Sequence, residues 1–145
     1  MKKIIASAAL ALFAFGMFLG GTPAMAQDNK VVIQVSDDNP RTMNIALNNA
    51  KNLTQALGAG NVDIEIVVYG PGLNMVAKDS KLAAKIKGLH AFGNVKFAVC
   101  GNTMKSRKWT KDNLLKDAFI QDSIVPGGVI RIMELQKQGY AYIRP

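Results

Sequence analysis

Residues 95–104 read Val-Lys-Phe-Ala-Val-Cys-Gly-Asn-Thr-Met, an apolar run that passes abruptly into a polar segment containing glycine. A short run rich in β-branched and aromatic residues, bounded by turn residues, is typical of a buried strand, which we expect over residues 95–99. The polar loop that we expect next begins with Cys100, the single cysteine of the chain. A lone cysteine forms no intramolecular disulfide, so Cys100 is a buried apolar side chain, a link to another molecule or a working thiol.

The strand pattern recurs on both sides of this stretch, and helical patterns separate the repeats. The other expected strands cover residues 30–35, 62–69, 123–125 and 140–143. The expected helices run from the Asn39 cap to Gly58, from about residue 79 to 89, from the Thr110 cap to residue 118, and over residues 129–138. Strands that alternate with helices predict the α/β class, here one domain built as a three-layer α/β/α sandwich around a mainly parallel five-stranded sheet.

Residues 1–26 have the pattern of a cleavable export signal. Lys2 and Lys3 precede an apolar run over residues 4–19, and residues 24–26 (Ala-Met-Ala) fit the small-x-small rule for cleavage. The apolar run is shorter than the roughly 20 residues that a membrane span needs, so we expect removal rather than a retained anchor. We therefore expect a periplasmic mature chain, residues 27–145, with no membrane-spanning segment.

The chain carries a formal net charge of +8, which removal of Lys2 and Lys3 lowers to +6. A moderately basic surface favours anionic ligands or partners. The basic residues are nevertheless dispersed, and no recognition motif with interleaved aromatic residues is present, so we expect no nucleic-acid partner. Export also places Cys100 in a compartment where thiols are usually paired, which makes a single cysteine informative.

Polar or glycine-rich loops follow several of the expected strands. In open parallel sheets, ligands bind outside the carboxyl ends of the strands, which places Cys100 at this rim as the candidate catalytic residue. The candidate binding residues lie in the same loops and are Gly72, Gly101, Asn102, Thr103, Gly127 and Gly128. Backbone amides near Gly101 or Gly128 could stabilise a thiolate or a persulfide anion. The basic residues from Lys105 to Lys111 could also lower the thiol pKa, or could form a solvated surface.

The sequence gives little support for a Cys–His pair, a metal site or a nucleotide-binding site. His90 is the single histidine and follows a helical pattern, so a Cys–His pair would require that segment to fold over the rim. Asp37 and Asp38 could suggest a metal site, but a polar loop before the helix cap explains them more simply, so we expect no metal. The sequence holds neither a GxGxxG fingerprint nor a P-loop, and we expect no cofactor.

Met75, Met104 and Trp109 are large apolar side chains close to the same loops. They could line an apolar pocket or a subunit interface. Side chains of this type more often fill a core, and we expect core packing for all three.

Three segments carry a family resemblance: the cysteine loop at residues 97–104, the Val-Tyr-Gly-Pro-Gly turn at residues 68–72, and the C-terminal stretch over residues 125–145. Together they resemble the DsrE/DsrF-like family of sulfur-relay proteins over most of the mature chain. The resemblance implies a five-stranded α/β/α fold, flavodoxin-like in style, and homo-oligomers, commonly trimers or hexamers. In characterised members a cysteine carries sulfur as a persulfide between partner proteins, and Cys100 alone can take that role here. Classical members are cytoplasmic, whereas this chain carries an export signal.

Three functions follow from these observations. The first is an exported sulfur carrier in which Cys100 bears a persulfide and exchanges sulfur with a donor and an acceptor protein. The second is a non-catalytic module that binds a small ligand or assembles into an oligomer, with Cys100 in a structural role. The third and weakest is a redox role through a Cys100–Cys100 bridge across an oligomer.

Overall fold

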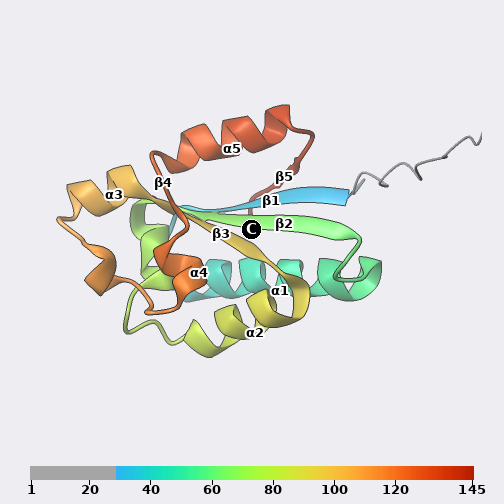
Figure 1. Cartoon of the computed structure of the whole chain (residues 1–145), viewed down its shortest axis with the longest axis horizontal. Helices are drawn as coiled ribbons and strands as arrows, with labels where there is room; N and C mark the ends of the chain where they lie inside the picture. The colour runs from blue at the N-terminus through green and yellow to red at the C-terminus, as the bar shows by residue number, and fades with distance from the viewer. Residues whose placement is uncertain (1–28) are drawn as a thin grey trace, which may run out of the picture.

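A computed structural model describes residues 29–145, in which five strands form one sheet (Figure 1). The export signal expected at residues 1–26 lies outside these described residues. The strand order is β4-β3-β2-β1-β5, and every pairing between neighbouring strands is parallel. The strands are β1 (Asn29–Val35), β2 (Val62–Val68), β3 (Lys96–Cys100), β4 (Ile124–Val125) and β5 (Ala141–Ile143).

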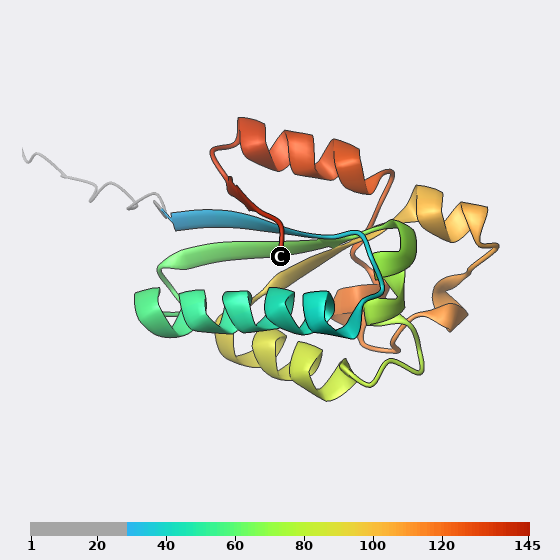
Figure 2. The ribbon, with the colours of Figure 1, turned by 180° about the vertical axis from the view of Figure 1, so that it is seen from behind.

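Helices cover both faces of this sheet, which confirms the predicted α/β/α sandwich (Figures 1 and 2). The longest helix, α1 (Pro40–Leu57), packs beside α2 (Ala83–Gly93) on one face, and α5 (Gly128–Lys137) lies on the other. Asn39 caps α1 by accepting a hydrogen bond from the Arg41 amide, and Pro40 fills the first helical position, as the sequence predicted. No helix within residues 29–145 is long and apolar enough to cross a membrane.

The two faces of the sheet bury very different amounts of apolar surface. Facing α1 and α2, a large cluster of buried side chains includes Ile33, Leu47 and Ile66, none of which is exposed to solvent. Facing α5, the cluster has five members: Val32, Val67, Ala98, Ile132 and Leu135. Alternate residues of one strand serve both clusters, because successive side chains of a strand point to opposite faces.

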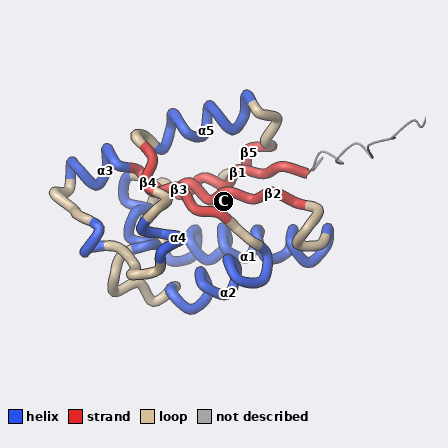
Figure 3. The backbone as a smooth tube through the Cα atoms, viewed as in Figure 1, coloured by secondary structure: helices blue, strands red, loops and turns tan. Residues whose placement is uncertain are grey.

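The remaining elements are short: those that directly follow β2 and β3 lie at the carboxyl edge of the sheet, and the last of them packs beside β3 (Figure 3). They are η1 (Gly70–Val76), α3 (Gly101–Ser106), η2 (Lys111–Asn113) and α4 (Ala118–Gln121), where η denotes a 3₁₀ helix. Two helices, α3 and α2, differ from the sequence prediction. The segment after Cys100 is the helix α3 rather than a loop, and α2 begins at Ala83 rather than near residue 79.

The single helix expected from the Thr110 cap to residue 118 is wrong. Thr110 does cap a helical turn, because its side chain accepts a hydrogen bond from the Asp112 amide, but that turn ends after Asn113. Leu114 then forms an isolated antiparallel bridge with Ala77. Pairing with a segment almost forty residues away along the chain overrides the local helical pattern here.

Candidate functional site

Cys100 lies where β3 ends and α3 begins. Its backbone is extended and pairs with Val125 of β4, while its side chain takes the capping position of α3. The residue is 5% exposed, so it is buried but close to the surface. The change from strand to helix at one residue directs Sγ to the carboxyl edge of the sheet, the place the sequence predicted.

Two backbone amides donate hydrogen bonds to the Cys100 Sγ atom. The Thr103 amide lies 3.4 Å away in the first turn of α3, and the Gly128 amide lies 3.2 Å away at the first residue of α5. Free amides and the helix dipole both make a helix N-terminus favourable for negative charge. Cys100 is therefore placed between the N-termini of two helices that are separate in sequence.

These contacts favour the ionised form of the thiol. Burial is the largest single influence on the pKa of Cys100 and raises it. Hydrogen bonds from the Thr103 hydroxyl, and from the amides of Thr103, Gly128 and Asn102, together outweigh burial and hold the pKa below its ordinary value. The thiolate is the nucleophilic form of cysteine, so the site increases the reactive fraction near neutral pH.

The close approach of α5 to Cys100 depends on glycine. A Cβ atom at Gly128 would lie 2.9 Å from the Cβ of Tyr69, nearer than side chains tolerate. Gly101 has a similar constraint at the start of α3, where a Cβ would lie 3.0 Å from the carbonyl oxygen of Val125. Both glycines therefore allow backbone to pack where a larger residue would move it away.

A small cavity of about 200 Å³ opens beside the thiol. It brings together four of the predicted site residues, Cys100, Asn102, Gly127 and Gly128, with three that the sequence reading missed, Tyr69, Val129 and Ile130. The position of Tyr69 directly after β2 is the signal that could have identified it. Val129 and Ile130 are exposed apolar side chains of α5, so the mouth of the cavity is apolar. The thiol itself accepts hydrogen bonds from backbone amides.

The other predicted residues have supporting positions. Thr103 accepts a hydrogen bond from the Gly70 amide at 2.9 Å, which fixes the hydroxyl beside Cys100. Gly72 does not line this cavity, and its Cβ would lie 2.3 Å from the carbonyl oxygen of Val35, so it permits η1 to pack on the end of β1. The backbone amide of Asn102 donates a hydrogen bond to the Pro126 carbonyl at 3.2 Å and so joins α3 to the loop before α5.

Two of the basic residues after Cys100 have partners away from the thiol. Arg107 donates to the Asn74 side chain at 2.7 Å and lies over the Trp109 ring, and Lys111 pairs with Asp122 at 3.3 Å. The lowered pKa of Cys100 therefore has its causes in hydrogen bonds rather than in these side chains.

Ionic and polar contacts hold α5 on the sheet. Arg131 of α5 makes two hydrogen bonds to the Glu65 carboxylate, at 2.6 and 2.7 Å, and Glu65 is only 3% exposed. Asp63 accepts a hydrogen bond from Tyr140 at 2.6 Å and pairs with Lys96 at 2.9 Å. Because α5 supplies the Gly128 amide, these contacts also position part of the thiol site.

His90 lies on the opposite side of the sheet from α5, and its ring stacks on Phe119 with centroids 4.0 Å apart. Its Nδ1 atom is 3.2 Å from the Val95 carbonyl. Within residues 29–145, no group of three or more His, Cys, Asp or Glu side chains is arranged to hold a metal ion.

Comparison with known proteins agrees with this geometry. The family model described as the DsrE/DsrF-like family matches residues 29–145. The chain belongs to the DsrE/DsrF-like family. The match covers every residue that the structure describes.

Two solved structures are similar to this member of the DsrE/DsrF-like family. The protein of unknown function MTH1491 from Methanobacterium thermoautotrophicum is 32% identical with a TM-score of 0.72, and the match covers 81% of this chain and 99% of that one. The conserved protein of unknown function BT1422 from Bacteroides thetaiotaomicron is 19% identical with a TM-score of 0.61 over 83% and 97% of the two chains, and supports the fold alone. No curated protein shows a significant match.

Proposed function

We propose that this protein is an exported sulfur carrier in which Cys100 receives sulfur as a persulfide and passes it on. The observation that carries the proposal is the pair of amides, from Thr103 and Gly128, that converge on the Cys100 Sγ atom. Membership of a family suggestive of sulfur relay supports the same chemistry. The pattern of residues 1–26 supports export to the periplasm.

The transfer step needs a donor that carries a persulfide. The Cys100 thiolate attacks the outer sulfur of the donor, an S–S bond forms at Sγ, and the S–S bond of the donor breaks. The donor leaves as a thiolate, so it is reduced by two electrons while Cys100 is oxidised to the persulfide level. Attack by an acceptor thiolate on the outer sulfur then reverses these roles and restores the Cys100 thiolate.

The site suits both states of the cysteine. The amides and the Thr103 hydroxyl stabilise the attacking thiolate, as the lowered pKa of Cys100 indicates. The cavity of about 200 Å³ beside Sγ has room for one additional sulfur atom. Its apolar mouth at Val129 and Ile130, both exposed, suits contact with the protein that donates or accepts sulfur, or with another subunit of a homo-oligomer.

Mass spectrometry of the protein, purified without reductant and incubated with a persulfide donor, tests the proposal. We expect a mass gain of one sulfur atom that maps to Cys100 and is removed by a thiol reductant. The Cys100→Ala variant should gain nothing. The absence of any adduct on the wild-type protein, or an equal gain in Cys100→Ala, would overturn sulfur carriage.

The low exposure of Cys100 favours a second candidate, a binding or assembly module in which the thiol only caps α3. Thiol titration separates the two functions. A carrier reacts with a small alkylating reagent while folded, whereas a purely structural cysteine reacts only after denaturation.

A further inference from the structure

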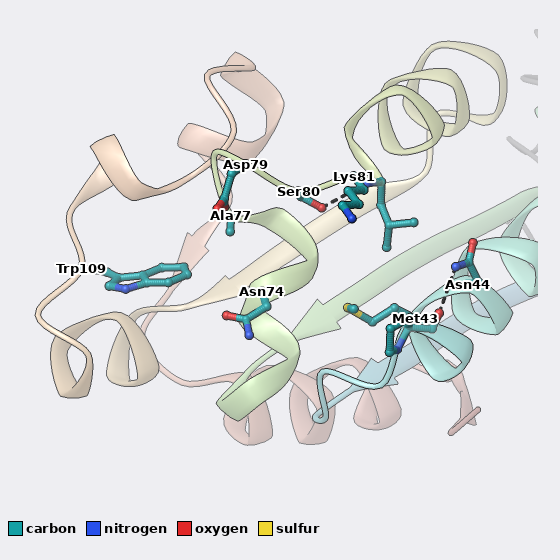
Figure 4. A pocket seen from close by; sticks show the side chains of 10 residues that line it. Met43, Asn44, Asn74, Ala77, Asp79, Ser80, Lys81 and Trp109 are labelled. Carbon is teal, nitrogen blue, oxygen red and sulfur yellow. Dashed lines mark hydrogen bonds between the residues drawn. The ribbon is translucent and has the colours of Figure 1, made fainter.

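A second, larger cavity lies away from Cys100. Its volume is about 560 Å³, and it shares no lining residue with the cavity beside the thiol. The start of α1, the helix η1, the turn before α2 and the Trp109 side chain enclose it (Figure 4). Cavities of about 300–1,000 Å³ are the usual size for small-molecule sites. The chemistry of its walls then determines what kind of molecule it fits.

The cavity has a substantial apolar surface. Trp109 lies at one end and Met43 at the other (Figure 4). Leu82 also lines the cavity. The Arg107 guanidinium lies over the Trp109 ring, 5.2 Å from its centroid, which fixes the orientation of the indole. Trp109 was expected in the core, and it does pack against the core edge, but it also lines this space. An aromatic wall of this kind suits a planar apolar group.

The two carboxamides in the cavity are oriented as hydrogen-bond donors. The Asn74 side-chain oxygen accepts from Arg107 at 2.7 Å, and the Asn44 oxygen accepts from Lys85 at 3.1 Å. Each carboxamide thus turns its oxygen to a cation and retains a nitrogen with two hydrogens. One hydrogen of Asn44 goes to the Pro40 carbonyl, and one of Asn74 goes to Asp38 at 3.4 Å. The second hydrogen of each remains available for an acceptor atom of a ligand.

Positive charge predominates around these donors. Lys81 lines the cavity, and Lys85 and Arg107 lie directly behind the two carboxamides. Among the ion pairs formed within residues 29–145, none involves these three cations. Asp79 on the cavity wall and Asp38 behind Asn74 are the acidic groups that oppose them. The excess of positive charge favours an anionic ligand group, and Asp79 reduces this preference.

We propose that this cavity binds a small organic carboxylate with a planar apolar body. The body contacts Trp109, and the carboxylate accepts hydrogen bonds from Lys81 and from the free amide hydrogen of Asn74. The proposal is independent of the sulfur chemistry at Cys100, because the two cavities have no residue in common.

Nuclear magnetic resonance offers a direct readout, because Trp109 is the single tryptophan of the chain and gives one indole N–H signal. Three matched probes are titrated into the nitrogen-labelled protein: cinnamate, the neutral cinnamyl alcohol and the cationic cinnamylammonium ion. We expect cinnamate to move the indole signal saturably and with the lowest Kd, followed by the alcohol and then the cation. An indole signal that none of the probes moves saturably, or equal Kd values for all three, would overturn the proposal.

Charge variants test the assigned contacts. Lys81→Gln should weaken cinnamate binding roughly threefold without changing the Kd of cinnamyl alcohol, and Asp79→Asn should strengthen cinnamate binding by a similar factor. Lys137 is an exposed lysine of α5, across the sheet, so Lys137→Gln is the matched control and should change neither Kd. Cinnamate binding that is insensitive to Lys81, or equally sensitive to Lys137, would contradict the site.

Discussion

The two faces of the sheet are held by different forces. Facing α1 and α2, buried apolar side chains such as Leu47 and Ile66 form an extended core. Facing α5, five buried apolar residues are supplemented by the Arg131–Glu65 pair and by the Tyr140–Asp63–Lys96 contacts. The thiol site belongs to the second face, because α5 delivers the Gly128 amide to Cys100. The comparison teaches that the extended core supports stability alone, whereas the α5 face supports both stability and thiol reactivity.

The largest loss of stability should follow from a cavity in the extended core. Leu47→Ala removes a side chain with no solvent exposure, and we expect the free energy of unfolding to fall by about 2–5 kcal/mol. Urea denaturation measures this loss. The pKa of the Cys100 thiol in the folded protein should stay at its wild-type value, and a rise would show that the two faces are not separable.

Breaking the ionic contact of α5 should lower stability less than Leu47→Ala does and should also change the thiol pKa. Glu65→Gln removes the charge from a buried carboxylate that Arg131 contacts twice, and we expect a loss of about 1.5–3 kcal/mol in unfolding free energy. Because α5 is then held less firmly, the pKa of Cys100 should rise. Asp112→Asn, which breaks an exposed pair with Lys116, is the matched control and should alter neither stability nor the thiol pKa measurably.

Gly128→Ala tests the close approach of α5 to the sheet. The added methyl group would lie 2.9 Å from the Tyr69 Cβ, which is too close for two carbon atoms. Helix α5 must therefore shift, and its Gly128 amide must move away from Sγ. We expect a loss of about 1–3 kcal/mol in unfolding free energy and slower alkylation of Cys100 at neutral pH. Gly88→Ala on α2, where a Cβ meets nothing within 4 Å, is the control and should leave the alkylation rate unchanged.

Thr103→Val removes the hydroxyl beside Cys100 while keeping the shape of the side chain. The Gly70 amide loses its acceptor, so we expect a cost of about 1–3 kcal/mol, together with a raised thiol pKa and slower alkylation. Thr103→Ser retains the hydroxyl and should restore the wild-type rate. A Thr103→Val protein with wild-type alkylation kinetics would show that the hydroxyl does not stabilise the thiolate.

The smallest expected effect is the pH dependence of stability that Cys100 contributes. Its pKa is lower in the folded than in the unfolded chain, so the unfolded chain holds the proton to higher pH. This contribution is complete above the unfolded pKa and is lost as the pH falls through the folded pKa. Unfolding free energy should therefore rise with pH across that window in the wild type, and the rise should be smaller in Cys100→Ser.

Much of the fold could be predicted because local patterns and tertiary structure agree. A nearly continuous apolar run indicated β1, and a run rich in β-branched residues indicated β2; both strands lie in the interior of the sheet. The Asn39–Pro40 pair indicated the start of α1. The helix expected from Thr110 failed because Leu114 pairs with Ala77, a contact that no local pattern encodes. Helix α3 was missed because its six residues begin with glycine and asparagine and are too few to show a period.

The site was partly predictable for the same reason. The rule that parallel strands end at one edge placed Cys100 near Gly128, and the structure joins them by a hydrogen bond. The rule could not separate glycines that approach the thiol from Gly72, which packs on Val35 instead. Nor could it show that Tyr69 lines the cavity, or that Arg107 turns to Asn74 and Trp109, because those contacts depend on side-chain directions.

The most direct test of the central claim is the ionisation of Cys100, followed by the ultraviolet absorbance of the thiolate against pH. The difference between the wild type and Cys100→Ser isolates this one thiol, and the same measurement in urea gives the unfolded reference. We predict that the folded protein ionises at a lower pH than the unfolded chain. An equal or higher pKa in the folded protein would contradict a thiolate stabilised by the converging amides of α3 and α5.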